Sequence, residues 1–471
     1  MSALRGGLTL LAGTGIGFVL RFARNVLIAR LLPVEDYGIA STFLVAVTFI
    51  DMALNLSLGK LAIQNKAGED PEFVAALTGI SILRGVLISA ILFIAAGPIA
   101  ALFGQPDLAW AYRVVALLPL IGSFQHPDIQ RLQRTMRFGP LMMNQLGSLG
   151  LTLALVWPLA LWLGDFRVML AIYLVEWLSR LAIGFALAER PFRARWDGKV
   201  ALLALRFGWP LLLSGLITFA ALQGDRIIIA NRFGVEMLGL FSAAMTLTMP
   251  PTMAAAEVIR TFFLPLLARH QDDSARFGYR ARFALESAFA IALFAVLGFG
   301  LLGPLVYPLV FGPRYGAGVE LVGLLGIVFG LQLARAGTTT VALARGNTSN
   351  LLIANLVQLA FLPLALLTAY LGAGARDVVA ISAAGQLCGL VASVVLLAVR
   401  SRVQGLDRLA LPAGFGLAAL AAMAWGIWTS AGDLVDPVPA GLALGAAALM
   451  LGTSRTLRAE FVARIVHRPR A

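Results

Sequence analysis

The sequence has little cysteine and little histidine. Its single cysteine, Cys388, lies in an apolar stretch without a partner, which excludes a disulfide framework and a cysteine metal site. We expect this side chain to pack in the apolar core. The three histidines, His126, His270 and His467, fall in loops or in the tail without the spacing of metal ligands. The sequence therefore predicts no metal centre and no bound cofactor.

Catalytic and nucleotide-binding motifs are missing as well. The sequence has no Gly-Lys-Ser/Thr phosphate-binding loop, so the chain cannot hydrolyse ATP by that route. A membrane polymerase, ligase or glycosyltransferase would normally carry a sizeable outer loop or a clustered acid and base, and neither is present. We expect a protein that is not an enzyme. Its energy source would be an ion gradient, the membrane potential or downstream consumption of its substrate.

Charged residues are scarce too. They make up 13% of the 471 residues and hydrophobic types make up 59%, so a soluble fold would lack the polar surface to cover its core. Mainly apolar stretches of roughly 20 residues, the length that crosses a bilayer, follow one another almost from end to end. The first stretch continues through Arg21 and Arg24 without a signal-peptide cleavage site. The predicted fold class is an all-α polytopic membrane protein.

Loops rich in proline, glycine and acidic residues divide these stretches into about fourteen transmembrane helices. The helices are expected near residues 8–30, 37–60, 73–103, 108–125, 140–163, 166–189, 203–231, 236–268, 281–311, 317–344, 349–372, 377–400, 409–430 and 438–454.

The distribution of basic residues agrees with these spans, because cytoplasmic loops should carry most of the lysine and arginine. The opposite set of loops holds little beyond Arg167, Arg232, Arg314 and Arg376. The basic set comprises Lys60, Lys66, Arg131, Arg134, Arg137, Arg190, Arg193, Arg195, Lys199, Arg269, Arg276, Arg280, Arg282, Arg345, Arg400, Arg402, Arg408 and the tail arginines. Both termini are therefore expected in the cytoplasm.

The tail, residues 455–471, is basic and has apolar residues between its arginines. This pattern is typical of an amphipathic helix on anionic lipid headgroups, and an ordinary topology anchor is the alternative. The formal net charge of +13 is carried by short loops and this tail rather than by one soluble face with recognition elements. We expect anionic lipids, and no nucleic acid, among the partners.

An internal repeat relates the segments 26–41 and 227–242 at an offset of 201 residues. The offset pairs Ala29 with Ala230, Val34 with Val235, Glu35 with Glu236, Gly38 with Gly239 and Ser41 with Ser242. Six helices separate the two segments, so the halves have the same orientation and are related by an axis along the membrane normal.

This parallel repeat predicts two six-helix lobes, residues 1–200 and 201–403, around a central cavity, followed by two additional helices within 404–454 and the tail. Two symmetric lobes around a site near the middle of the membrane are a recurrent plan of transporters. We therefore expect transport by alternating access.

The repeated segments also resemble a known family. Residues 24–38, 207–215, 224–230 and 233–242 are similar to the polysaccharide flippases of the multidrug, oligosaccharidyl-lipid and polysaccharide exporter superfamily. The resemblance covers nearly the whole chain through diffuse patterns. It implies a substrate, undecaprenyl-diphosphate-linked oligosaccharide, that is turned across a bacterial inner membrane for cell-surface or exopolysaccharide biosynthesis. A polysaccharide polymerase or export machinery would be a further partner.

Arginines inside the predicted helices are the candidate substrate ligands. An ionisable group at membrane depth is costly unless it is paired or wetted, and a guanidinium binds phosphate oxygens bidentately. The resemblance to lipid-II flippases implies Arg24 and Arg260, because those proteins carry cavity arginines in their first and eighth helices. Further candidates are Arg21, Arg84 and Arg335, of which the first two can also lie at a cytoplasmic cavity mouth.

Acidic residues in the helices are candidates for a coupling-ion site or a counter-ion, namely Asp225, Asp51 and Glu257. The repeat alignment places Asp225 opposite Arg24.

Pairing within one helix is the plainer interpretation for some of these charges. Glu176 and Arg180 stand four residues apart, and Glu257 and Arg260 stand three apart, so each pair can neutralise itself.

Two other functions compete with a flippase. A cation-coupled multidrug exporter of the same superfamily is expected to show buried acids rather than an arginine-rich interior. A lipid scramblase or a structural scaffold is a third interpretation, but a scaffold gives no reason for unpaired arginines at membrane depth.

Overall fold

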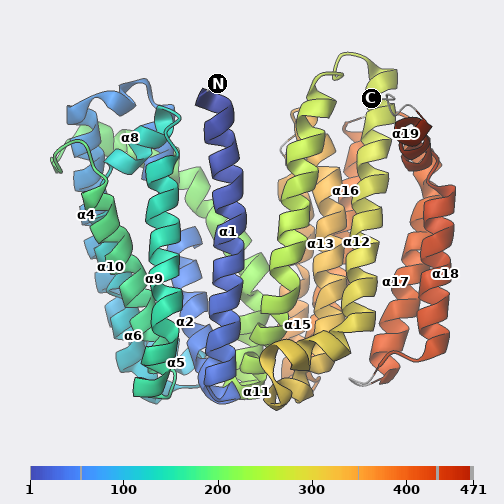
Figure 1. Ribbon diagram of the computed structural model, residues 1–471, viewed down its shortest axis with the longest axis horizontal. Helices are drawn as coiled ribbons and strands as arrows, with labels where there is room; N and C mark the ends of the chain where they lie inside the picture. The colour runs from blue at the N-terminus through green and yellow to red at the C-terminus, as the bar shows by residue number, and fades with distance from the viewer. Residues whose placement is uncertain (1, 54–55, 348, 402, 431–433, 467–471) are drawn as a thin grey trace. The chain divides into compact units, whose positions relative to one another are not determined.

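The computed structural model describes residues 2–53, 56–347, 349–401, 403–430 and 434–466. Within these ranges the regular elements are all helices, and Figure 1 shows the long ones. The chain divides into two compact units, Met1–Gly239 and Leu240–Ala471. The lobe boundaries expected from the repeat, at residues 200 and 403, stay a prediction.

Among its described residues, the first unit contains ten complete α-helices, two short 3-10 turns, and the beginning of a very long helix. These elements are α1 (Ser2–Leu31), α2 (Val34–Ala53), α3 (Leu58–Gln64), η1 (Lys66–Glu69), α4 (Pro71–Ile94), α5 (Ala96–Leu102), η2 (Pro106–Leu108), α6 (Ala109–Val115), α7 (Leu118–Ser123), α8 (Asp128–Arg134), α9 (Gly139–Leu163), α10 (Arg167–Ala186) and the start of α11 (Gly198–Ala268).

The second unit holds the rest of α11 and the following helices. These are α12 (Ser274–Phe311), η3 (Pro313–Gly318), α13 (Val319–Ala344), α14 (Ser349–Leu359), α15 (Phe361–Tyr370), α16 (Ala375–Val399), η4 (Leu406–Leu409), α17 (Ala410–Ser430), α18 (Pro437–Thr453) and α19 (Arg455–Val466). The predicted tail therefore begins as a helix, and its residues 467–471 lie outside the described ranges.

Helix α11 is two helices joined by a kink. Its backbone leaves the helical conformation at Gly234, where φ is 84° and ψ is 172°. Glycine suits this position because a side chain would disfavour a positive φ. The sequence had placed the break between residues 231 and 236, which agrees with the kink.

Ten helices of the described part are long and apolar enough to cross a membrane, or eleven if the bent pair Pro106–Ser123 and Asp128–Arg134 is one span. The predicted all-α polytopic membrane fold is confirmed. The count of fourteen spans stays a prediction.

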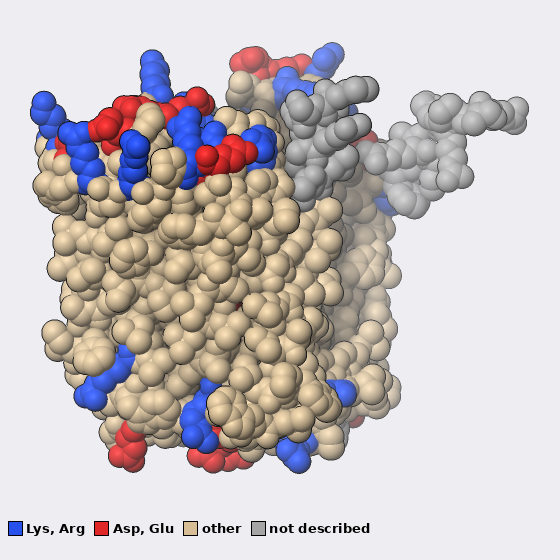
Figure 2. Space-filling view, turned by 60° about the vertical axis from the view of Figure 1, so that its left-hand side comes forward, with Lys and Arg blue, Asp and Glu red and all other residues tan. Residues whose placement is uncertain are grey.

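The surface agrees with this assignment. On the face turned forward in Figure 2, charged residues gather in two rims, and the broad band between them is almost entirely uncharged. Such a band is the surface that lipid tails solvate, because a charge at that depth is costly.

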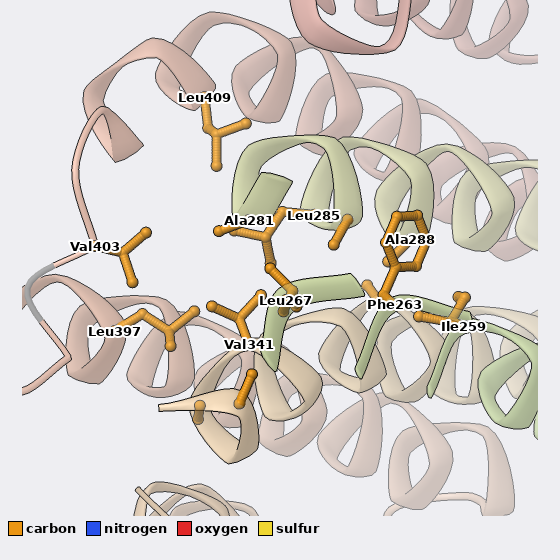
Figure 3. Close-up of a cluster of buried hydrophobic side chains, with 14 of the residues drawn as sticks. Ile259, Phe263, Leu267, Ala281, Leu285, Ala288, Val341, Leu397, Val403 and Leu409 are labelled. Carbon is orange, nitrogen blue, oxygen red and sulfur yellow. The ribbon is translucent and has the colours of Figure 1, made fainter. Parts of the chain in front are cut away.

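Small and branched apolar side chains fill the core of the second unit. Figure 3 shows part of this cluster, in which alanines of α12 lie against larger side chains of α11, α13 and α16. Members include Ile259, Phe263, Leu267, Ala281, Leu285, Ala288, Val341 and Leu397. Alanine at these positions lets helix backbones approach closely, which is how membrane helices gain packing energy.

The expectation for Cys388 was wrong. Its side chain is exposed on α16 rather than packed in the core. In a membrane an apolar side chain gains little by leaving the lipid, so an apolar sequence context does not predict burial.

Candidate functional site

A large cavity lies inside the first unit. Its volume is about 850 Å³, and α2, α3, α4 and α7 to α11 contribute to its wall. The charged residues in the wall are Asp51, Lys60, Arg84 and Arg180. The remainder is built largely from amide, hydroxyl and apolar side chains. The cavity therefore combines fixed charges with many neutral hydrogen-bonding groups.

The cavity extends from α8 into the body of the unit. Arg134 of α8 lies 3.6 Å from Glu69, measured from Nε to Oε1, so α4 begins at the α8 end, which Figure 1 shows at the top. Arg84 lies about 20 Å further along α4, at 1.5 Å of rise per residue from Pro71. Because Gln130 of α8 and Arg84 line the same cavity, it reaches from the end of the unit to the depth of the spans.

A buried ion cluster adjoins this cavity. One carboxylate oxygen of Glu176 lies 2.5 Å from Nη1 of Arg24, and the other lies 2.6 Å from Nη2 of Arg180. Arg24 also donates a hydrogen bond to Oγ1 of Thr152 at 3.4 Å. Glu176 and Arg24 are buried, whereas Arg180 reaches the cavity wall. The cluster thus links α1 and α9 to the cavity through α10.

Other predicted residues lie in the same electrostatic neighbourhood. The charges that act on Arg21 are those of Arg180, Glu176, Arg24 and Asp51. Asp51 in turn interacts with Arg180, Glu176, Arg84 and Arg21. The structure therefore brings together the four predicted residues Arg21, Arg24, Arg84 and Asp51, with Glu176 and Arg180 beside them. Four arginines against two carboxylates leave a formal charge of +2.

Arg180 and Gln130 of the cavity wall each carry a buried polar atom that stays unsatisfied in the described part of the chain. Nε of Arg180 and Oε1 of Gln130 are buried, and neither has a hydrogen-bond partner within the described part of the chain. Leaving a buried polar group unpaired costs about 1–3 kcal/mol, more for a charged one. A ligand that offers an acceptor to Arg180 and a hydroxyl to Gln130 would satisfy both.

Ion pairs hold α8 in place at the end of the cavity. Arg131 pairs with Asp128 and lies 2.7 Å from Glu189, and Arg137 lies 2.7 Å from the other oxygen of Glu189. Hydrogen bonds from Arg131 and Arg137 hold the pKa of Glu189 below its usual value. Arg134 donates to the carbonyl oxygens of Ile63, at 2.8 Å, and Asn65, and so caps the end of α3.

Arg335, a further predicted ligand, lies in the second unit. It is buried on α13, and its Nη2 donates to Oε1 of Gln358 at 2.9 Å. Its Nη1 lies 3.5 Å from the carbonyl oxygen of Ala354. Its partners among the described residues are therefore neutral oxygens rather than a carboxylate.

The remaining predicted residues lie on α11. Arg260 and Glu257 are exposed in the second unit and form the i,i+3 pair at 3.3 Å. Asp225 is half-buried in the first unit, but the carboxylate that pairs with Arg24 at 2.5 Å is Glu176. The role of Asp225 as a counter-ion or coupling-ion site stays a prediction.

The acidic, histidine and cysteine side chains of the described residues do not form a metal site. Within the described ranges of residues 2–466, no group of three or more His, Cys, Asp or Glu side chains is placed to hold a metal ion.

Sequence reasoning missed part of the cavity wall. Lys60 was interpreted as a loop charge and Arg180 as a partner of Glu176, although both line the cavity. The glutamines of the cavity wall were not predicted as site residues. Their signal was present, since Gln125, Gln130 and Gln133 lie close together around a proline in a short segment between two spans.

The chain matches a known protein family. A family described as "Polysaccharide biosynthesis protein" matches residues 27–320. This range includes α2 to α10, all of α11 and α12, and therefore the whole cavity wall.

Curated relatives carry related names. The chain is 24% identical over 333 residues to the succinoglycan biosynthesis transport protein ExoT of Rhizobium meliloti, covering 69% of this chain and 65% of that protein. It is 22% identical over 324 residues to the lipopolysaccharide biosynthesis protein WzxC of Escherichia coli, covering 67% and 63%. The matched part spans less than two thirds of the length of these two relatives.

Solved structures share the fold. The lipid II flippase MurJ in an inward closed conformation superposes with a TM-score of 0.69 at 13% identity, covering 98% of this chain and 100% of that one. An inward-facing multidrug resistance transporter of the MATE family gives 0.67 at 19% identity, covering 84% and 96%. At such identities the likeness concerns the fold alone.

Proposed function

The chain belongs to the polysaccharide biosynthesis protein family, and from this premise we propose that it is a flippase for undecaprenyl-diphosphate-linked oligosaccharides. It would move them across the bacterial inner membrane by alternating access, for cell-surface or exopolysaccharide biosynthesis. The names of the relatives support this proposal, since one is a transport protein of succinoglycan biosynthesis and another a lipopolysaccharide biosynthesis protein.

The observation that carries the proposal is the excess positive charge at the cavity. Arg84 and Arg180 line it, and the surrounding cluster has a formal charge of +2. A diphosphate diester bears a negative charge on each of its two phosphates, so its headgroup would neutralise the cluster. Guanidinium groups are suited to this task because they stay charged and offer paired donors to phosphate oxygens.

Glu176 would act as a fixed internal counter-ion in this mechanism. Its carboxylate oxygens form ion pairs with Nη2 of Arg180 and Nη1 of Arg24, which hold both side chains in one orientation. Nε of Arg180 remains to donate to a phosphate oxygen. Side chains held in this way lose little conformational entropy when the headgroup binds, which lowers the cost of binding. Arg24, Arg21, Arg260 and Arg335 stay proposed headgroup ligands.

The basic residues at α8 support loading from the cytoplasmic leaflet. Helix α8 carries Arg131 and Arg134, and Arg137 follows it, and basic segments between spans face the cytoplasm. The cavity would therefore receive its substrate from that side. Movement of the proposed lobes, residues 1–200 and 201–403, would then expose the headgroup to the other side.

The proposed location is the inner membrane, with both termini in the cytoplasm. Helix α19 is held to α12 by an ion pair between Arg280 and Glu460 at 2.8 Å and by a hydrogen bond from the backbone N–H of Leu457 to Glu286 at 2.7 Å. A basic helix fixed in this way could rest on anionic lipids. A polymerase or export machinery is a further proposed partner.

A cation-coupled multidrug exporter is the second candidate, and it is supported by the fold likeness to the MATE transporter. The cavity disfavours it, because a net positive lining repels an organic cation.

A deletion strain tests the proposed function. Loss of the gene should cause lipid-linked oligosaccharide to accumulate on the cytoplasmic leaflet, and the wild-type gene should reverse this. A strain that keeps normal surface polysaccharide but becomes sensitive to cationic drugs would instead support the multidrug exporter.

A further inference from the structure

The α8 end of the cavity differs chemically from its depth. Glutamines dominate there, with Gln130 and Gln133 on α8, Gln125 just before it and Gln145 near the start of α9. Lys60 is the charged residue of this end. A side-chain amide both donates and accepts hydrogen bonds, as a sugar hydroxyl does. This end therefore suits a neutral, hydroxyl-rich ligand.

Gln130 gives the most specific indication. Its Oε1 is buried without a hydrogen-bond partner in the described ranges, although the side chain lines a cavity. A Cβ added to Gly59 would lie 3.3 Å from Cγ of Gln130, so the side chain packs closely against α3. A hydroxyl can donate or accept, and it would therefore satisfy the amide in either orientation.

Helix α8, which carries Gln130 and Gln133, is well anchored. Arg131 lies between Asp128 and Glu189, and Arg134 donates to the carbonyl oxygens at the end of α3. Binding groups on an anchored helix are presented with little loss of conformational entropy. This anchoring separates the α8 glutamines from an ordinary polar surface turn.

We propose that the α8 end of this cavity is the glycan subsite of the substrate, with Gln130 as a specificity-determining residue. The inference rests on the proposed flippase function and deepens it. In the substrate the diphosphate stands between the lipid and the glycan. The cavity has the same order, since Arg84 lies at the depth of the spans and the amides lie at the α8 end of the unit.

The subsite can be tested by calorimetric titration of the purified full chain in lipid nanodiscs. One probe is the oligosaccharide repeat unit hydrolysed from the host's own surface polysaccharide, and the other is inorganic diphosphate. The test variant is Gln130→Met, which keeps the side-chain volume but removes the amide. Gln64→Met is the matched control, because Gln64 is exposed on α3 at the same end and does not line the cavity.

We expect Gln130→Met to weaken binding of the oligosaccharide roughly tenfold, as loss of a buried hydrogen bond does, and to leave diphosphate binding unchanged. Gln64→Met should bind both probes as the wild type does. Arg180→Gln should show the opposite pattern, with weaker diphosphate binding and unchanged oligosaccharide binding.

The outcomes separate the two proposals. Wild-type protein that binds diphosphate but not the oligosaccharide, or a Gln130→Met variant with unchanged oligosaccharide affinity, overturns the glycan subsite alone. A Gln130→Met variant that loses both probes, or that melts at a lower temperature than Gln64→Met, shows a structural role and also overturns it. Wild-type protein that binds neither probe removes the support for the flippase itself.

Discussion

Gly38 and Gly239 lie against each other with no room for a side chain between them. A Cβ on Gly38 would overlap the carbonyl oxygen of Val235, and a Cβ on Gly239 would overlap that of Val34. The offset of 201 residues pairs these same four residues in the sequence. The contact is therefore reciprocal, as a two-fold axis between two equivalent turns requires. This geometry supports a parallel repeat.

Replacing either glycine should destabilise the protein. Gly38→Ala would force the two turns apart, and overpacking of this kind costs about 1–3 kcal/mol. The control is Gly298→Ala on α12, where an added Cβ meets nothing within 4 Å. That change should be neutral or stabilise by about 0.5–1 kcal/mol, because alanine is favoured in helices. Thermal unfolding in detergent measures both, and equal melting temperatures would contradict the close contact.

The parallel repeat also predicts the topology of the two turns. Glu35 and Glu236 are both exposed, so cysteines placed there should react with a reagent that does not cross the membrane. Both should be labelled from the periplasm only, whereas Arg193→Cys in the α10–α11 loop should be labelled from the cytoplasm only. The background needs Cys388→Ser, because Cys388 is itself exposed. Labelling of Glu35→Cys and Glu236→Cys from opposite sides would rule out the parallel repeat.

The carboxylate of Glu176, which pairs with both Arg24 and Arg180, should stabilise the folded protein. Glu176→Gln would leave Arg24 and Arg180 without their counter-ion, and breaking a buried ion pair costs about 3–5 kcal/mol. The control is Glu72→Gln, because Glu72 and Arg195 form an exposed pair worth less than about 1 kcal/mol. Unfolding midpoints of purified variants give the comparison. A Glu176→Gln protein as stable as Glu72→Gln would mean that the cluster is already neutralised by other groups.

Arg24 and Arg260 should each be needed for export. We expect Arg24→Ala and Arg260→Ala to reduce surface polysaccharide by about tenfold or more, since each removes a charged hydrogen-bond donor. Arg193→Ala, an exposed loop arginine, is the control and should export normally. Immunoblots of the membrane fraction check that protein amounts are equal. Normal export by both the Arg24→Ala and the Arg260→Ala variant would exclude these residues as headgroup ligands.

Much of the fold could be predicted from the sequence, because apolar length and loop charge depend on local composition. The expected break of α11 lies at Gly234, and the expected pairs of Glu176 with Arg180 and Glu257 with Arg260 are present. Such features need only neighbours along one helix.

The cavity wall could be predicted only in part. Arg24 meets Glu176 across 152 residues, a contact that no helical period indicates. Cys388 and Arg180 both occupy apolar helices, yet Cys388 is exposed and Arg180 lines the cavity. In a single membrane sequence the lipid-facing and cavity-facing sides have similar composition, because lipid tails and protein cores are equally apolar.

Flipping by the reconstituted protein tests the central claim most directly. Proteoliposomes carrying undecaprenyl-diphosphate-linked oligosaccharide would be assayed for the fraction of glycan that an external hydrolase can reach. The wild type should transfer the lipid between leaflets. The double variant Arg84→Gln, Arg180→Gln should be folded but reduced by about tenfold or more, because the cavity has lost two charged donors. Equal flipping by the double variant and the wild type would contradict an arginine-lined headgroup site.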